Sequence, residues 1–169
     1  MAKKKSKNTG LILSVVVLVL GVAAFCMSFL TGVKYISALT KETAFEFTGF
    51  QTMFGYTETT GSIIEVSSKF LGFSILATLA FVLPLVGAVL TFVKNKIARL
   101  VGAVLMLAGA VMLFLLPSFV VLATVDGNLT AAAAMVKACE TSTLGIGAIL
   151  GGVFAGLGGL VAGFSALKK

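Results

Sequence analysis

The sequence predicts an all-α membrane protein, a bundle of four transmembrane helices with a small extracellular cap. Two observations of composition lead to this fold class. Four stretches of 24 to 27 residues contain no charged side chain, and about 20 apolar residues of helix cross a hydrocarbon core about 30 Å thick. Charged residues make up only 11% of the chain, against about 25% in ordinary soluble domains. The uncharged runs are Asn8–Val33, Phe70–Val93, Leu100–Val125 and Thr141–Leu167.

These runs define one membrane domain over residues 1–169. We expect spans at about 10–33, 70–93, 100–125 and 142–166, outer loops at 34–69 and 126–141, and an inner loop at 94–99. Because the inner loop is so short, it predicts an antiparallel helical hairpin.

The distribution of charge predicts the orientation. Basic residues cluster in cytoplasmic segments beside the ends of spans. The two tails and the 94–99 connection hold nine basic residues and no acid, whereas the other two connections hold four basic and six acidic residues. We therefore expect a multi-pass protein of the plasma membrane with both termini in the cytoplasm. The nine residues are Lys3, Lys4, Lys5, Lys7, Lys94, Lys96, Arg99, Lys168 and Lys169.

The first run has a second interpretation as a signal peptide. It follows a basic start, and Ala23-Ala24-Phe25-Cys26 resembles a lipoprotein cleavage box. The run is longer than the roughly 7–15 apolar residues of a secretory signal, and Phe25 is large for the box. We expect a retained anchor; cleavage would leave three spans.

Each of the two central runs contains one proline, Pro84 or Pro117. A proline inside a helix removes a backbone hydrogen bond and usually bends the helix. The bend is either a fixed kink that fits the bundle or a hinge, and a fixed kink is the favoured hypothesis.

The fourth run carries a heptad seam made wholly of small residues. Gly145, Ala148, Gly152, Ala155, Gly159, Ala162 and Ala166 follow one another at alternating steps of three and four. In lipid, helices associate through close backbone approach, which small residues permit. The seam predicts either packing within the chain, which we favour, or a functional role in which it drives self-association or lines a pore.

The first outer loop is rich in aromatic residues at alternating positions. Phe45, Phe47, Phe50, Phe54 and Tyr56 lie in this segment. Period-two alternation of aromatic residues suggests a short β-hairpin. The hairpin would be either a recognition surface or a cover for the bundle, and we expect Thr59–Ser68 to form its flexible return.

The second outer loop begins with an Asp126-Gly127 turn, and a short helix over Ala131–Ala138 is expected after it. Asn128 is a plausible helix cap, and Asn128-Leu129-Thr130 matches a weak glycosylation pattern.

No residue pattern predicts catalysis. The chain has no His, its cysteines Cys26 and Cys139 form no CxxC motif, and no predicted span contains an ionisable residue in its interior. Intramembrane ionisable residues usually mark ion pathways and proton relays. We therefore expect a non-enzyme without a catalytic site, metal site or cofactor. The basic residues form no stripe interleaved with aromatics, so nucleic-acid binding is not expected either.

The predicted plan resembles claudin-type tetraspan proteins in topology, with inner termini and a long first outer loop. The first outer loop of this chain has no Trp and no cysteine pair, so that family's disulfide-pinned sheet is not expected here. The chain also resembles small four-span membrane proteins of low-GC Gram-positive bacteria, through Gly49-Phe50-Gln51 and Phe54-Gly55-Tyr56. Neither resemblance implies an activity or a functional residue.

These observations favour a non-enzymatic integral membrane protein that acts as a structural, assembly or accessory subunit of a membrane complex. Its expected partners are the lipid bilayer and either a second copy or another membrane protein. The alternative is a small oligomeric channel or holin-like pore. A pore would require a polar face along a span, and only scattered residues such as Ser74, Thr78 and Thr91 are available.

Overall fold

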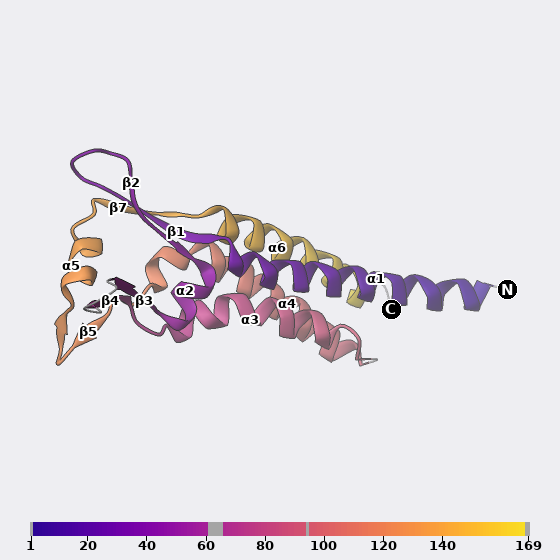
Figure 1. Cartoon of the computed structure of the whole chain (residues 1–169). Helices are drawn as coiled ribbons and strands as arrows, with labels where there is room; N and C mark the ends of the chain where they lie inside the picture. Colours follow the sequence, from indigo (N-terminus) through magenta and orange to yellow (C-terminus); the bar gives the residue numbers. More distant parts are fainter. Residues whose placement is uncertain (1, 61–65, 94, 168–169) are drawn as a thin grey trace. The chain divides into compact units, whose positions relative to one another are not determined.

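Helices and strands both form in this chain, and they gather into two units (Figure 1). The computed structural model describes residues 2–60, 66–93 and 95–167. The helical unit comprises Met1–Met27, Leu79–Leu113 and Ile149–Lys169. The sheet unit comprises Ser28–Thr78 and Phe114–Ala148. Each unit has a hydrophobic core of its own.

Four apolar helices supply the helical unit: α1 (Ala2–Cys26), α3 (Ile75–Leu90), α4 (Lys96–Phe114) and α6 (Ile146–Leu167). Within the described residues, three helical stretches are long and apolar enough to cross a membrane, namely Gly10–Phe29, Lys96–Phe114 and Ile146–Leu167. The fourth helix, α3, has 16 residues and is shorter than the usual span of about 20.

Glycine and alanine allow these helices to approach closely. A Cβ added to Gly87 of α3 would lie 2.5 Å from the carbonyl oxygen of Gly102 in α4. The ring of Pro84 occupies the space that a side chain at Gly109 would need, since a Cβ there would lie 2.5 Å from the proline Cδ. The core of the unit includes a buried cluster of Val17, Ala88, Ala103, Met106 and Ala162.

The sheet unit contains three small antiparallel sheets. The largest has the order β2-β1-β7, formed by Thr43–Thr48, Thr31–Ile36 and Thr141–Leu144. A second pairs β3 (Tyr56–Thr60) with β4 (Val66–Leu71), and a third pairs β5 (Thr124–Val125) with β6 (Asn128–Leu129). Two short helices complete the unit, α2 (Gly49–Phe54) and α5 (Ala131–Lys137).

The prediction of an all-α bundle of four transmembrane helices is therefore wrong. The described chain is mixed, with six α-helices and three antiparallel sheets. The error has a physical cause, because absence of charge does not distinguish a helix from a strand. Thr31–Val33 and Thr141–Leu144 were expected inside or beside spans, yet both segments pair as neighbouring strands.

The predicted second and third spans are shorter than expected because local signals end their helices. At the start of α3, the Ser74 hydroxyl accepts a hydrogen bond from the Ala77 N–H at 3.2 Å. At its end, Thr91 Oγ1 donates to the Ala88 carbonyl at 2.7 Å. Helix α4 ends at Phe114, and Pro117 lies in a 3₁₀ segment, Leu116–Phe119, because proline cannot continue the helical hydrogen-bond ladder.

The prediction of one hairpin within 45–57 is also wrong. A capping box at Thr48 starts α2 in the middle of the segment: Thr48 Oγ1 accepts from the Gln51 N–H, and Gln51 Oε1 accepts from the Thr48 N–H. This reciprocal pair satisfies two backbone donors and favours a helix. Strand β2 consequently pairs with β1, and β3 pairs with β4. The expected flexible return Thr59–Ser68 is wrong in its described part, because Thr59 pairs with Ser67 and Thr60 pairs with Val66 across β3 and β4. Residues 61–65 lie outside the described part.

The second outer loop follows the prediction closely. Asp126 and Gly127 both have positive φ, at 51° and 80°, and they connect β5 to β6 as a two-residue turn, which requires such angles. The expected short helix is α5, but its N-cap is Thr130, whose side chain accepts from the Ala133 N–H. Asn128 instead pairs with Val125 as part of β6.

Candidate functional site

The aromatic residues expected to form one cap separate into two groups in the sheet unit. Phe47 lies at the centre of a buried cluster and is 2% exposed. Its ring centroid lies 5.9 Å from those of Tyr35 and Tyr56 and 6.2 Å from that of Phe70. Phe45 stacks on Phe47 at 6.4 Å. We call these five residues the aromatic cluster, and they form much of the core of the unit.

Phe50 and Phe54 belong to a different and exposed group. Phe29, Phe50, Phe54 and Phe73 follow one another with centroid separations of 5.8, 4.7 and 6.4 Å. Their side chains are between 42% and 63% exposed. We call these four residues the phenylalanine row. The row is thus exposed, whereas Phe47 of the aromatic cluster is buried.

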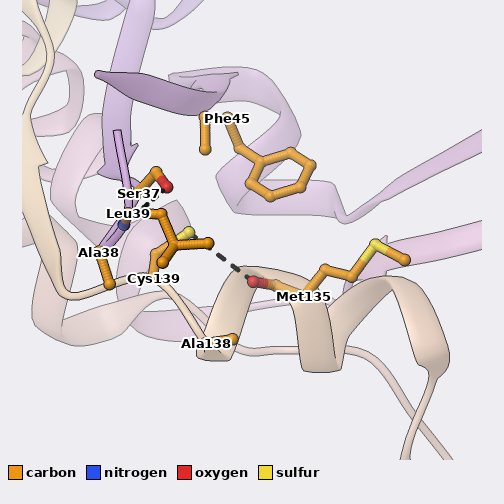
Figure 2. Close-up of a pocket in the computed structure, with 8 residues that line it drawn as sticks. Ser37, Ala38, Leu39, Phe45, Met135, Ala138 and Cys139 are labelled. Atoms are coloured by element: carbon orange, nitrogen blue, oxygen red, sulfur yellow. Dashed lines mark hydrogen bonds between the residues drawn. The ribbon is translucent and has the colours of Figure 1, made fainter. Parts of the chain in front are cut away.

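A shallow apolar groove lies between the β1–β2 connection and the end of α5 (Figure 2). It has a volume of about 210 Å³. Leu39, in the connection, is 94% exposed, and Met135, on α5, is 61% exposed. Figure 2 shows these two side chains on facing elements, with Phe45 beside them. The lining residues are Ser37, Ala38, Leu39, Ala44, Phe45, Met135, Ala138 and Cys139.

Hydrogen bonds hold the groove in this form. The Ser37 hydroxyl accepts from the backbone N–H of Leu39 at 3.2 Å, which shapes the connection. On the other side, the Cys139 thiol donates to the Met135 carbonyl at 3.7 Å. Lys41 forms an ion pair with Glu140, which joins the connection to the segment before β7. The groove is thus bounded by tethered elements on both sides.

Two ionisable groups near the groove have shifted pKa values. The hydrogen bond from Lys34 Nζ, at 2.7 Å across the β1–β2 pair, holds the pKa of the Glu46 carboxyl below its ordinary value. Burial raises the pKa of the Tyr35 phenol, and the nearby Cys139 thiol adds to the effect. Both shifts favour fixed protonation states at neutral pH: a charged Glu46 and a neutral Tyr35.

The small-residue seam of the fourth run is buried by residues of the same chain. In the helical unit, Ala155 and Ala162 are almost fully buried, and Gly152 and Gly159 are buried as well. A Cβ added to Gly159 would lie 2.8 Å from Leu107 Cγ.

The start of the seam lies in the sheet unit. The Gly145 N–H donates to the Gly32 carbonyl at 2.8 Å, and Ala148 is fully buried. The seam therefore already has partners within the chain in both units.

Within the described residues, no three His, Cys, Asp or Glu side chains gather as they would around a metal ion. Two side chains in the described part of the helical unit donate to backbone carbonyls that lie between α3 and α4. Ser14 Oγ donates to the Thr91 carbonyl at 3.3 Å, and Arg99 Nε donates to the Val93 carbonyl at 3.1 Å. These groups hold helix ends.

Sequence reasoning missed Leu39 and Met135, the two most exposed apolar residues of the groove. Leu39 lies within the polar segment Ser37–Glu42, and a leucine surrounded by turn-forming polar residues is a detectable signal. Phe29 and Phe73 were assigned to the predicted first and second spans, so their contacts with Phe50 and Phe54 were not expected. Comparison with protein-family models, curated proteins and solved structures finds no match for this chain.

Proposed function

We propose that this chain is a non-enzymatic, multi-pass integral protein of the plasma membrane that serves as an accessory subunit of a membrane complex. The observation that carries the proposal is the inverted packing of the long helices. In α6 every buried position except Ser165 is Gly or Ala, whereas the exposed ones are bulky, such as Val153, Leu157 and Leu160, the last 63% exposed.

Bulky side chains are exposed on α1 and α4 as well, among them Val19, Val104 and Val111. Apolar surface of this extent is costly in water. In lipid it costs nothing, because acyl chains are as apolar as the side chains themselves, and small residues then drive the packing of helices. A bilayer is thus the solvent that fits this surface.

The charge of the two units supports an orientation with both termini in the cytoplasm. The segments of the helical unit carry nine basic residues and no acid, and those of the sheet unit carry four basic and six acidic residues. Within the helical unit, Ser14 of α1 bonds to Thr91 after α3, and Gly163 of α6 lies near Ala103 of α4. These contacts bring Ser14 beside the segment after α3 and Gly163 beside Ala103. They support a common side for the basic segments, as the positive-inside rule predicts.

The groove of the sheet unit supports the role of an accessory subunit. A leucine that is 94% exposed gains roughly 1.5–3 kcal/mol when a partner buries it fully. The surrounding tethers reduce the cost of ordering the groove on binding. A partner protein with an apolar side chain fits this shallow site.

Cysteine labelling tests the orientation. In a Cys26→Ser background, Cys139 is expected to react with a membrane-impermeant maleimide in intact bacterial cells that express the chain. A cysteine placed at Ser6 in a background without both native cysteines should react only after permeabilisation. The reverse pattern would contradict the orientation, and extraction of the chain by carbonate without detergent would contradict membrane insertion.

Site-specific photo-crosslinking tests the groove. A photoreactive residue at Leu39 should give one discrete adduct in the cells of origin, and Met135→Asp should abolish it. The matched control is the same residue at the exposed Thr59 of β3. Equal, diffuse adducts from both positions would refute the groove as a docking site.

A further inference from the structure

The phenylalanine row is displayed by α2, which holds two of its members one helical turn apart. Phe50 and Phe54 are exposed on this six-residue helix, whereas Gly49, Thr52 and Met53 are buried. The helix is therefore amphipathic, with its apolar and aromatic face left uncovered by the sheet unit.

Backbone hydrogen bonds at both ends of α2 fix that face. The Gly49 N–H donates to the Leu30 carbonyl at 3.0 Å, and the Met53 carbonyl accepts from the Ser74 N–H at 3.0 Å. Leu30 follows the first candidate span directly, and Ser74 precedes α3 directly. Helix α2 thus connects the end of one apolar helix to the start of another.

The end of the first candidate span indicates how deep in the bilayer the phenylalanine row would lie. That span, Gly10–Phe29, has 20 residues, and at 1.5 Å per residue it is about 30 Å long, the thickness of a hydrocarbon core. Phe29 is its last residue and also the first ring of the row, stacked on Phe50 at 5.8 Å. The row therefore begins where the hydrocarbon core would end.

We propose that α2 is an interfacial helix, whose phenylalanine row lies in the boundary between acyl chains and lipid headgroups. The occupant of this apolar face is the lipid bilayer, because the row begins with Phe29, the last residue of a candidate span. Helices of this kind bury their apolar face about 5–10 Å into the boundary. The inference rests on the proposed membrane insertion, and it adds a lateral contact that holds the sheet unit against the membrane surface.

Single tryptophans test the inference cleanly, since the chain contains no Trp. Three variants are compared in vesicles of phosphatidylcholine and phosphatidylglycerol that contain only the purified chain. Phe54→Trp probes the row, Leu160→Trp probes the exposed face of α6, and Leu39→Trp probes the groove. Fluorescence is quenched in turn by aqueous iodide, by lipids labelled near the carbonyls and by lipids labelled deep in the acyl chains.

We expect Phe54→Trp to emit at shorter wavelength than Leu39→Trp and to be quenched most by the shallow lipid label. Leu160→Trp should respond most to the deep label, and Leu39→Trp to iodide. If Phe54→Trp behaves like Leu39→Trp while Leu160→Trp remains lipid-quenched, the interfacial helix is refuted and membrane insertion stands. If iodide quenches all three, both proposals fail. Phe50→Trp repeats the test should Phe54→Trp not fold.

Discussion

Replacing Phe47 with alanine should destabilise the sheet unit far more than replacing a residue of the phenylalanine row with alanine. The Phe47 side chain is 2% exposed, and burial of an aromatic side chain removes roughly 150–250 Å² from water. At about 25 cal/mol per Å² this burial is worth roughly 4–6 kcal/mol. Alanine retains part of it, so the expected loss is about 3–5 kcal/mol, the range for such changes in other cores.

The chain carries its own reporter for this experiment. Its two tyrosines, Tyr35 and Tyr56, both pack against Phe47, and no tryptophan obscures their emission. Urea unfolding of the protein in mild detergent, followed by tyrosine fluorescence, therefore reports on the aromatic cluster. The matched control is Phe50→Ala, which truncates an exposed ring of the same unit and should cost less than about 1 kcal/mol.

A milder variant keeps the test usable if the alanine variant does not fold. Phe47→Leu refills part of the volume but loses the ring contacts, and we expect it to cost roughly 1–2 kcal/mol. Equal unfolding midpoints for the Phe47 and Phe50 variants would refute the assignment of Phe47 to the core.

Three further predictions test other parts of the structure. Gly159→Leu should lower the thermal stability of the monomer. Gly163→Ala should not, because the Cβ added there has its nearest neighbour at 3.8 Å. Size-exclusion chromatography with light scattering would distinguish lower stability of the monomer from a loss of oligomers. Gly55→Ala should destabilise more than Gly127→Ala, since both have positive φ but only Gly55 has a backbone oxygen 2.8 Å from the added Cβ; thermal melts of the two variants provide the comparison. Because the pKa of Glu46 is lowered in the folded chain, its contribution to stability is complete above the unfolded pKa and is lost as the pH falls through the folded pKa. Glu46→Gln should therefore reduce the fall of the urea unfolding midpoint at acidic pH.

Local signals of the second outer loop were sufficient to predict its turn and its short helix, although not the β5–β6 pair, because the chemistry that decides a turn or a helix start is local. The Asp126-Gly127 turn requires positive φ at two adjacent residues, which these residue types tolerate. The helix after it needs a cap within a few residues, and only the identity of the cap was mistaken, Thr130 in place of Asn128. Such signals act over a few residues and can be recognised in a single sequence.

The structure of the first outer loop could not be predicted because it depends on distant partners. Thr31–Val33 extends an apolar run, and only its pairing with β2 and β7 makes it a strand. The aromatic cluster likewise joins Tyr35, Phe47 and Phe70 from three strands. Hydropathy measures preference for an apolar environment, whereas strand or helix formation here depends on which backbone groups find partners.

The buried seam of α6 bears on where a partner could bind. Its small residues are the feature of the sequence that most favours association between chains, yet they are occupied by residues such as Leu107 and Gly32 of the same chain. A second copy could reach them only by displacing these contacts. The outward face of α6 is bulky and offers no comparable close approach. The proposed assembly is therefore expected to use another surface, and in the sheet unit the groove at Leu39 offers exposed apolar side chains.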